Sequence, residues 1–369
     1  MGRLILILFL ILLSGCQENQ IVVTEKLSAT RLLSSVDQQG FDRAEKPREF
    51  IFPQDHGPHP RFRNEWWYFT GNLEDSSGRR FGYQVTFFRF ALKPPSEKAA
   101  ASHWANNQIW MAHAAITDKD SKRHLTQEKL VRAGPGLAGS HAQPFSVWVE
   151  DWQVQQGKEG FPWHIRINSE RFKLDLEVEP TVGIILQGDK GLSQKSAEPG
   201  NASYYYSYPR LNSRGQITIN GQRYLVTGLS WFDREWGTSA LSPEQTGWDW
   251  FSLQFNSGDN LMFYHLRNRQ GTADPFSAGT WIDNTGNAKR LSLNEIEVAP
   301  SNWWRSPNGN NYPVEWTMKL KADNRTLRIK PILNEQEMDL SVRYWEGAVD
   351  IYEQGKQIGS GYLEMTGYE

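Results

Sequence analysis

Cysteine is almost absent from this sequence, and Cys16 is its single example. One cysteine cannot form an intramolecular disulfide or a cysteine-rich metal site, so packing of the core must stabilise the fold. An excess of one charge is also absent, because 40 basic and 42 acidic residues leave a formal net charge of −2. This balance gives no long-range attraction to nucleic acid, and we expect no nucleic-acid partner.

Several common catalytic signatures are missing as well. The sequence has no Gly-x-Ser-x-Gly elbow, no His-Glu-x-x-His pair and no Gly-rich phosphate loop with a lysine. A hydrolase built on such a motif is therefore not indicated, and we expect no cofactor. His56 and His59 are three residues apart in a Pro-rich segment and lack a third ligand, so we expect no bound metal.

Long apolar runs are scarce, and the one near the N-terminus is short. Residues 4–13 form an apolar run of about ten residues after Arg3, which is too short for the roughly 20 of a spanning helix but typical of a signal-peptide core. The run leads into Leu13-Ser-Gly-Cys16, which resembles the lipobox of bacterial lipoproteins. We therefore expect residues 1–15 to be a lipoprotein signal peptide. An ordinary secretory signal and a short buried helix are the alternatives.

The lipobox resemblance implies that the thiol of Cys16 carries a lipid and holds the protein in the cell envelope. Gln17 follows Cys16, where lipoproteins retained in the inner membrane of Gram-negative enterics carry aspartate. In a Gram-negative host we therefore expect the protein at the periplasmic face of the outer membrane. Residues 16–50 are largely polar and are expected to form a lipidated tether and lead-in.

The rest of the chain has the pattern of an all-β protein. Aromatic residues make up 13% of the chain, with 16 tryptophans, and apolar residues fall in short segments broken by Gly, Asn and Pro. Residues 172–178 alternate apolar with charged side chains, and Asn220-Gly221 is a strong hairpin signal. Such strands favour antiparallel barrels or sandwiches. The chain is longer than one hydrophobic core normally serves, so we expect two β domains, over residues 51–200 and 201–369.

Six segments carry a family resemblance. They are Asn64-Glu-Trp-Trp-Tyr-Phe-Thr-Gly71, Tyr206-Ser-Tyr-Pro-Arg-Leu211, Trp231-Phe-Asp-Arg-Glu-Trp-Gly237, Gly247-Trp-Asp-Trp-Phe-Ser-Leu253, Tyr344-Trp-Glu-Gly-Ala-Val349 and Gly361-Tyr-Leu-Glu-Met-Thr-Gly367. In this order they resemble the family that joins AttH-like lipocalin-domain proteins with carotenoid 1,2-hydratases. The resemblance covers roughly residues 50–368, and it implies two lipocalin-like antiparallel β-barrels packed together.

The resemblance leaves several functions open. Carotenoid hydratases add water to a terminal isoprenoid double bond, whereas exported AttH-like members are associated with ABC-transporter components. The lipobox and the Trp-rich motifs resemble the second group more. The resemblance thus implies a membrane-anchored protein that binds an apolar or amphipathic small molecule in one of its barrels, linked to an ABC-type transport system. The alternatives are a hydratase or isomerase acting on an isoprenoid-like alkene, and a purely structural adaptor.

Water addition to an alkene needs a proton donor, an apolar pocket and a group that stabilises a carbocation, which aromatic faces can do. Asp233, Glu235 and Asp249 are flanked by tryptophans, and burial among aromatic rings raises the pKa of a carboxyl. We therefore name these three as candidate catalytic residues. The candidate ligand-binding residues are mostly aromatic side chains of the same motifs: Trp66, Trp67, Tyr68, His113, Trp231, Arg234, Trp236, Trp248, Trp250 and His265.

Structural roles compete with these functional ones. Arg234 stands where carotenoid hydratases typically carry histidine, and an arginine cannot donate a proton at ordinary pH. It alternatively forms an Arg–carboxylate clamp between the domains. On a strand, Trp248 and Trp250 would face one side and Asp249 the other, so the three cannot share one pocket. His113 and His265 are alternatively core histidines of their strands.

Overall fold

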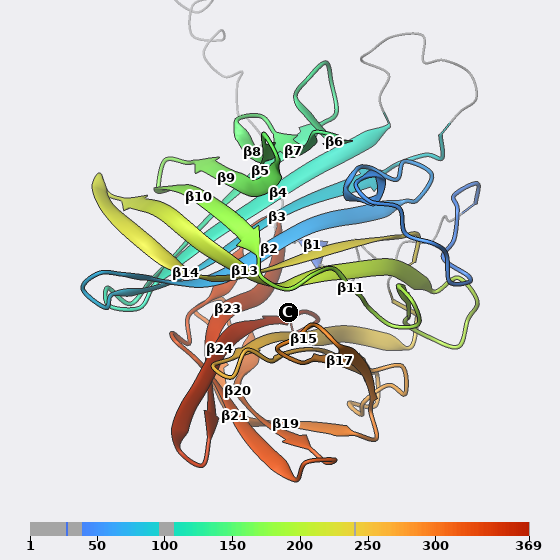
Figure 1. Ribbon diagram of the computed structural model, residues 1–369. Helices are drawn as coiled ribbons and strands as arrows, with labels where there is room; N and C mark the ends of the chain where they lie inside the picture. The colour runs from blue at the N-terminus through green and yellow to red at the C-terminus, as the bar shows by residue number, and fades with distance from the viewer. Residues whose placement is uncertain (1–26, 29–38, 96–106, 240, 369) are drawn as a thin grey trace, which may run out of the picture.

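The computed structural model describes residues 27–28, 39–95, 107–239 and 241–368 (Figure 1). The expected signal peptide (residues 1–15), Cys16 and most of the expected tether lie outside the described residues. In the part that is described, no helix combines the length and the apolar character needed to cross a bilayer. The single-turn 3-10 helix η1 (Gln54–His56) interrupts a structure that is otherwise strands and turns.

The first sheet has 13 strands. Their bounds are β2 (Asn64–Asp75), β3 (Arg80–Ala91), β4 (Gln108–Asp118), β5 (Arg123–Arg132), β6 (Ala138–Ala142), β7 (Phe145–Val149), β8 (Trp152–Gly157), β9 (Gly160–Asn168), β10 (Phe172–Pro180), β11 (Ile185–Leu186), β12 (Leu192–Gln194), β13 (Ala202–Ile219) and β14 (Gln222–Gly237). The order is β5-β4-β3-β2-β14-β13-β10-β9-β8-β7-β6, with β11 and β12 paired to β13.

The second sheet has 11 strands. Their bounds are β1 (Leu27–Ser28), β15 (Gln245–Phe255), β16 (Asn260–Asn268), β17 (Ala278–Ile282), β18 (Ala288–Ser292), β19 (Ile296–Arg305), β20 (Asn311–Leu320), β21 (Arg325–Pro331), β22 (Glu337–Asp339), β23 (Val342–Glu353) and β24 (Lys356–Met365). The order is β18-β17-β16-β15-β24-β23-β21-β20-β19, and β1 and β22 pair with β23. Figure 1 shows this sheet curling below the first one.

The expected all-β, two-domain lipocalin-like fold is confirmed by these two large antiparallel sheets. The strands β13 and β14 pair within the first sheet, so the chain passes from one sheet to the other between Gly237 and Gln245. The expected domain limits, 51–200 and 201–369, stay a prediction.

Each sheet encloses its own aromatic core on one face. In the first sheet Trp67, Phe69 and Phe232 belong to this core, and in the second sheet Trp316 and Trp345 do so. Because neighbouring residues on a strand point to opposite faces, the alternate residues of the same strands point towards the other sheet. Two further clusters of buried residues therefore form between the sheets.

The sheets meet closely. A Cβ atom on Gly82 would lie 2.6 Å from the Cβ of Ala348, so only glycine allows β3 to approach β23 to this distance. Near this contact Arg80 forms an ion pair with Asp350 across the junction, with an N–O distance of 2.6 Å. The outward faces of the sheets are thus held together and removed from water.

The interior of the first sheet also contains a buried ion cluster. Glu65 accepts hydrogen bonds from the guanidinium groups of Arg89 and Arg234, and all three side chains are fully buried. The Arg234 guanidinium lies 3.8 Å from the ring centroid of Trp67. The Arg–carboxylate clamp considered for Arg234 therefore exists within the first sheet and does not join the two sheets.

We predict that Glu65→Gln lowers the free energy of unfolding by about 3–5 kcal/mol, because two buried guanidinium groups lose their counter-charge. Urea unfolding followed by tryptophan fluorescence at neutral pH measures this change. Glu297→Gln removes an exposed partner of Lys319 and is the control, with an expected change below about 1 kcal/mol.

The penalty of Glu65→Gln should shrink in acid. Burial disfavours the charged form of Glu65, but Arg89 and Arg234 outweigh burial and hold its pKa well below the ordinary value of 4.5. The carboxylate therefore stabilises the fold above that value, and this contribution is lost as the pH falls towards the folded pKa. An equal penalty at neutral pH and in acid would contradict the ion cluster.

Candidate active site

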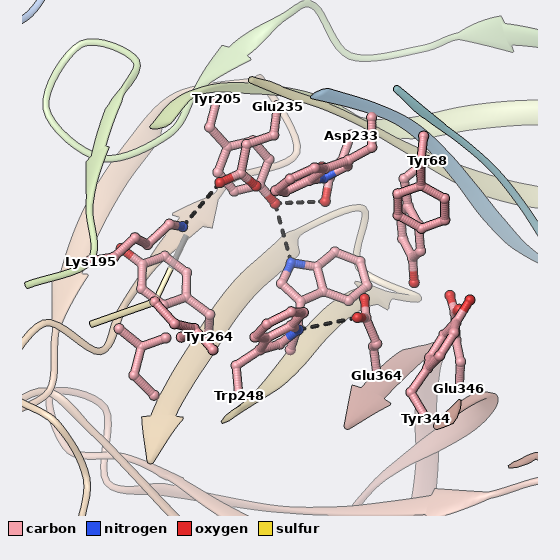
Figure 2. Close-up of a pocket in the computed structure, with 15 residues that line it drawn as sticks. Tyr68, Lys195, Tyr205, Asp233, Glu235, Trp248, Tyr264, Tyr344, Glu346 and Glu364 are labelled. Atoms are coloured by element: carbon pink, nitrogen blue, oxygen red, sulfur yellow. Dashed lines mark hydrogen bonds and ion pairs between the residues drawn. The ribbon is translucent and has the colours of Figure 1, made fainter. Parts of the chain in front are cut away.

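A pocket with a cavity volume of about 90 Å³ lies between the outward faces of the two sheets (Figure 2). Both sheets line it, so it is not the interior of either barrel. Its polar lining consists of Asp233, Glu235, Lys195, Glu346 and Glu364, and its aromatic and aliphatic lining consists of Trp66, Tyr68, Phe88, Tyr205, Trp248, Trp250, Tyr264, Tyr344, Leu241 and Leu266. The ligand site expected inside one barrel stays a prediction. Buried aromatic side chains pack the inner face of each sheet, and this pocket lies at the junction of the sheets instead.

Strand alternation decides which residues of each motif reach the pocket. On β14, Asp233 and Glu235 face the pocket, whereas Arg234 and Trp236 face the interior of the first sheet. The carboxyl groups of this motif are therefore separated from its arginine. On β2 the same alternation sends Trp66 and Tyr68 to the pocket and Trp67 to the interior.

The alternation expected for Trp248, Asp249 and Trp250 is present in the structure. The two indoles line the pocket. Asp249 points to the opposite face of β15, where it forms an ion pair with Arg267 and a hydrogen bond with His265. The distance from the Asp249 carboxyl to the His265 Nδ1 is 2.9 Å. Asp249 and His265 therefore lie away from the pocket, and their contacts give them a structural role.

Two other sequence candidates lie directly behind the pocket wall. Trp231 does not line the pocket, but its indole N–H donates a hydrogen bond of 2.7 Å to Asp233. His113 is fully buried, and its Nδ1 lies 2.7 Å from the hydroxyl of Tyr344, which does line the pocket. Both residues support groups that a ligand would touch.

On the first-sheet side, the carboxyl of Asp233 accepts hydrogen bonds from three neighbouring side chains. Tyr205 and Ser207 donate hydrogen bonds of 2.6 Å and 2.5 Å to its two oxygens, in addition to the Trp231 indole. Burial raises the pKa of Asp233 to about 7, although these hydrogen bonds favour the charged form. The group is thus poised between its two protonation states near neutral pH.

Glu235 lies two residues further along the same strand and has a cationic partner. The ammonium group of Lys195, from the segment after β12, lies 3.2 Å from its carboxylate. The Nζ of Lys195 also lies 4.2 Å from the ring centroid of Tyr264, which is cation–π distance. On this side of the pocket the charge of the Glu235 carboxylate is therefore balanced by Lys195. Figure 2 shows Glu235 and Lys195 beside Tyr205.

The second-sheet side carries two carboxyls that form no ion pair with any described residue. Glu346 on β23 and Glu364 on β24 are directly paired across the hairpin. Burial, followed by the repulsion of Glu364, raises the pKa of Glu346 well above its ordinary value. Burial raises the pKa of Glu364 to about 8, although the Trp248 indole donates to it across 3.2 Å. The pair is therefore protonated at neutral pH, as two like charges at one buried site cannot both form.

The oxygens of the Glu346 carboxyl are free to accept or donate further hydrogen bonds. Neither of its oxygens has a hydrogen-bond partner of ordinary geometry among the described residues, although the hydroxyls of Tyr68 and Tyr344 lie close enough to affect its pKa. Its side chain is 1% exposed. A buried acid with unused oxygens that faces a pocket is available to a ligand.

Sequence reasoning did not identify the most perturbed acids of the site. Glu346 and Glu364 stand in two of the motifs that carry the family resemblance, but each is a single carboxyl in its strand. Only the pairing of β23 with β24 brings them together. A signal was present, because Tyr344, Glu346 and Ala348 share one face by alternation. Lys195 and Tyr205 were missed because no motif marks them.

A metal site is not formed by the described residues, among which no three His, Cys, Asp or Glu side chains gather as ligands. His56 instead contacts the hydroxyl of Tyr206 at 2.6 Å. His59 contacts Asp55 at 3.0 Å and stacks on the ring of Trp236.

Comparisons with known proteins agree with the fold. The family model described as AttH-like matches residues 43–368. A solved AttH-type structure from Nitrosomonas europaea is similar with a TM-score of 0.80 and 33% sequence identity, over 89% of this chain and 100% of that one. Kievitone hydratase from Nectria haematococca, also a solved structure, has a TM-score of 0.65 and 14% identity, over 89% and 98% of the two chains.

A curated relative points the same way over a shorter region. Kievitone hydratase of Fusarium solani subsp. phaseoli is 21% identical over 183 residues, which are 46% of this chain and 48% of that protein. The match thus spans about half the length of this relative.

We predict that Glu364→Gln stabilises the protein at neutral pH. The folded pKa of Glu364 is about 8, against an ordinary value of 4.5. Between these values the wild type loses up to about 1.4 kcal/mol of stability per pH unit, because the unfolded state releases the proton first. Glutamine keeps an oxygen for Trp248 and has no charge to bury. Urea unfolding from pH ~5 to pH ~8 should therefore show a growing advantage of the variant, and parallel profiles would contradict the raised pKa.

Proposed function

The chain belongs to the AttH-like family, and on that premise we propose that the pocket between its sheets is the active site of a hydratase-type lyase. Its substrate would be a neutral lipophilic alkene, or the alcohol formed when water is added. The observation that carries the proposal is the direct pairing of Glu346 with Glu364 at the wall of an aromatic pocket, where neither carboxyl forms an ion pair with a described residue. The similarity to kievitone hydratase supports the same class of reaction.

The pocket contains an acid side and a base side. The Glu346–Glu364 pair holds a proton at neutral pH. Asp233, on the other sheet, is partly ionised there. Separation of two carboxyl pKa values by environment is how active sites assign acid and base roles at one pH. A substrate between the sheets would have a proton donor on one side and a proton acceptor on the other.

In the hydration direction, the acid pair would donate its proton to one alkene carbon, and the π electrons would form the new C–H bond. The faces of Trp248 and Trp250 would stabilise the carbocation by about 0.5–2 kcal/mol each. A water molecule would then attack the cation, and Asp233 would accept the proton that this water releases. The sum is alkene plus water to alcohol, with one proton moved from the acid pair to Asp233.

Binding without turnover is the second candidate function. The lipobox at residues 13–16 and the resemblance to transport-linked relatives favour it. In that case the pocket would carry an apolar or amphipathic molecule for an ABC-type transport system. Purified protein would then retain a lipid or an isoprenoid through extraction and release it unchanged.

We predict that turnover depends on the acid pair. Incubation in ¹⁸O-labelled water with terminal isoprenoid alkenes, and separately with kievitone, should yield a product that carries one labelled oxygen. Glu364→Gln and Glu346→Gln should each lower kcat by about 10²–10⁴, the usual contribution of a general acid. Mass spectrometry of the product measures both effects.

Glu337→Gln is the matched control, because Glu337 is a buried carboxyl of the second sheet that bonds to Tyr312 away from the pocket. Its turnover should equal that of the wild type. Unchanged turnover in both acid variants would contradict the acid role, and retention of an unaltered ligand with no labelled product would favour the carrier.

We also propose that lipid on Cys16 anchors the protein at the periplasmic face of the outer membrane. Metabolic labelling with radioactive palmitate should mark the wild type, which should sediment with outer-membrane fractions on a density gradient. Cys16→Ser should be unlabelled and should leave the membrane fractions. Co-sedimentation of the variant with membranes to the same extent would refute the anchor.

A further inference from the structure

A line of polar contacts joins the pocket with the protein surface through a histidine that the reaction above does not use. The hydroxyl of Tyr344, at the pocket wall, lies 2.7 Å from the Nδ1 of His113. The Nε2 of the same ring lies 3.2 Å from the carboxylate of Glu128. The Glu128 side chain is 19% exposed, whereas that of His113 is 0% exposed. The line thus begins at Tyr344, which lies close enough to Glu346 to affect its pKa, and ends at solvent.

We infer that Tyr344, His113 and Glu128 form a proton relay that returns a proton from solvent to the Glu346–Glu364 pair. The inference rests on the proposed function, because the Glu346–Glu364 pair needs a returned proton only if it gives one to a substrate. The chemistry assigned is proton exchange between bulk water and a buried carboxyl. The three relay residues are not expected to touch the substrate's reacting atoms.

The relay crosses the junction of the sheets. His113 lies on β4 and Glu128 on β5, which are paired in the first sheet with these two residues opposite each other. Tyr344 lies on β23 of the second sheet. Ser341 donates from its backbone N–H and from its hydroxyl to Glu128, the latter at 2.6 Å. The outer end of the relay is therefore held by both sheets.

Glu346 is the buried member of the acid pair, whereas Glu364 is half-buried, and the other neighbours of Glu346 offer no comparable route. The hydroxyls of Tyr68 and Tyr362 have no hydrogen-bond partner among the described residues, so a proton passed to either would go no further. Glu364 is contacted by the indole of Trp248, which is a donor only. Of the described side chains that face Glu346, Tyr344 alone continues, through His113, to a titratable group with exposed atoms, which is Glu128.

The hydrogen bonds allow one proton to move without a charged intermediate. Burial lowers the pKa of His113 below its ordinary value, so the ring is neutral and one nitrogen donates while the other accepts. An outward transfer along the same line leaves the ring with its proton on Nδ1. From that tautomer, Glu128 that has taken up a proton from solvent would donate to Nε2, the Nδ1 proton would pass to the Tyr344 oxygen, and the Tyr344 proton would pass to Glu346. The result is a neutral ring with its proton on Nε2, and one proton gained by Glu346.

Infrared spectroscopy of the whole protein tests the relay without a substrate. The carbonyl band of a protonated carboxyl shifts when its proton is replaced by deuterium. Glu346→Gln and Glu364→Gln identify the band of the acid pair by removing it. Rapid dilution into D₂O then measures how quickly solvent exchanges with this pair. The relay predicts that His113→Gln, whose amide keeps both hydrogen bonds but does not pass protons, slows this exchange by about tenfold or more.

Two further variants separate a relay from a structural contact. Glu128→Gln, at the partly exposed end, should slow the exchange in the same way without a change in the core. His113→Gly should be slow as well, and added imidazole should restore the wild-type rate. His124→Gln is the matched control, because His124 also connects the sheets, through Thr117 and Gln336, but does not reach the acid pair.

Slow exchange in His113→Gln and Glu128→Gln, with a normal rate in His124→Gln, is the expected result. Equal rates in all variants would overturn the relay and leave the proposed hydratase in place. A wild-type spectrum without a carboxyl band that Glu346→Gln or Glu364→Gln removes would overturn the acid of the proposed function, and the relay with it.

Discussion

Removal of carboxyl groups from water at the junction of two sheets is the constraint on which the site depends. Glu346 and Glu364 are neighbours on paired strands, and the second sheet cannot separate them without breaking its ladder. The first sheet covers Glu346 fully and Glu364 in part, and contacts such as Gly82 against Ala348 keep that cover close. Since two adjacent charges cannot form in such a place, the fold itself keeps a proton there. The same desolvation weakens the fold at high pH and would let the pair act as the proposed proton donor at neutral pH.

Strand alternation separates this chemistry from the structural charges of the molecule. On β14, Arg234 turns inward to the ion cluster with Glu65, while Asp233 turns outward to the pocket. On β15, Asp249 turns inward to Arg267, while Trp250 turns outward. Each sheet therefore has an inner face that holds it together and an outer face that lines the pocket. A pocket is present outside the packed interiors of the barrels, because the second barrel closes over the outer surface of the first.

The sequence predicts the fold class well and the site in part. Aromatic, alternating segments and the family motifs predict two lipocalin-like β domains. These two signals can be read from the sequence because each depends on a local pattern of residues. The alternation of Trp248, Asp249 and Trp250 follows from the period of a strand alone. Which face of that strand meets the pocket does not, because it depends on how two sheets pack.

The contact between Glu346 and Glu364 could not be predicted from the sequence for a related reason. Glu346 and Glu364 are 18 positions apart, and their contact depends on the register of a hairpin that contains a bulge between Ile351 and Tyr352. A shift of one residue would send one carboxyl to the opposite face. Lys195 comes from a segment between strands and was equally hidden, because its partner Glu235 is 40 positions away.

The central claim is that one of the two paired glutamates holds a proton at neutral pH. Carbon-13 NMR of protein labelled at glutamate carboxyl carbons, recorded through a pH titration with Glu364→Gln as the assignment reference, measures it most directly. The predicted result is a resonance that titrates near the pKa of about 8 given to Glu364 and is missing from the variant. If every glutamate carboxyl carbon has completed its titration below neutral pH, the claim is contradicted.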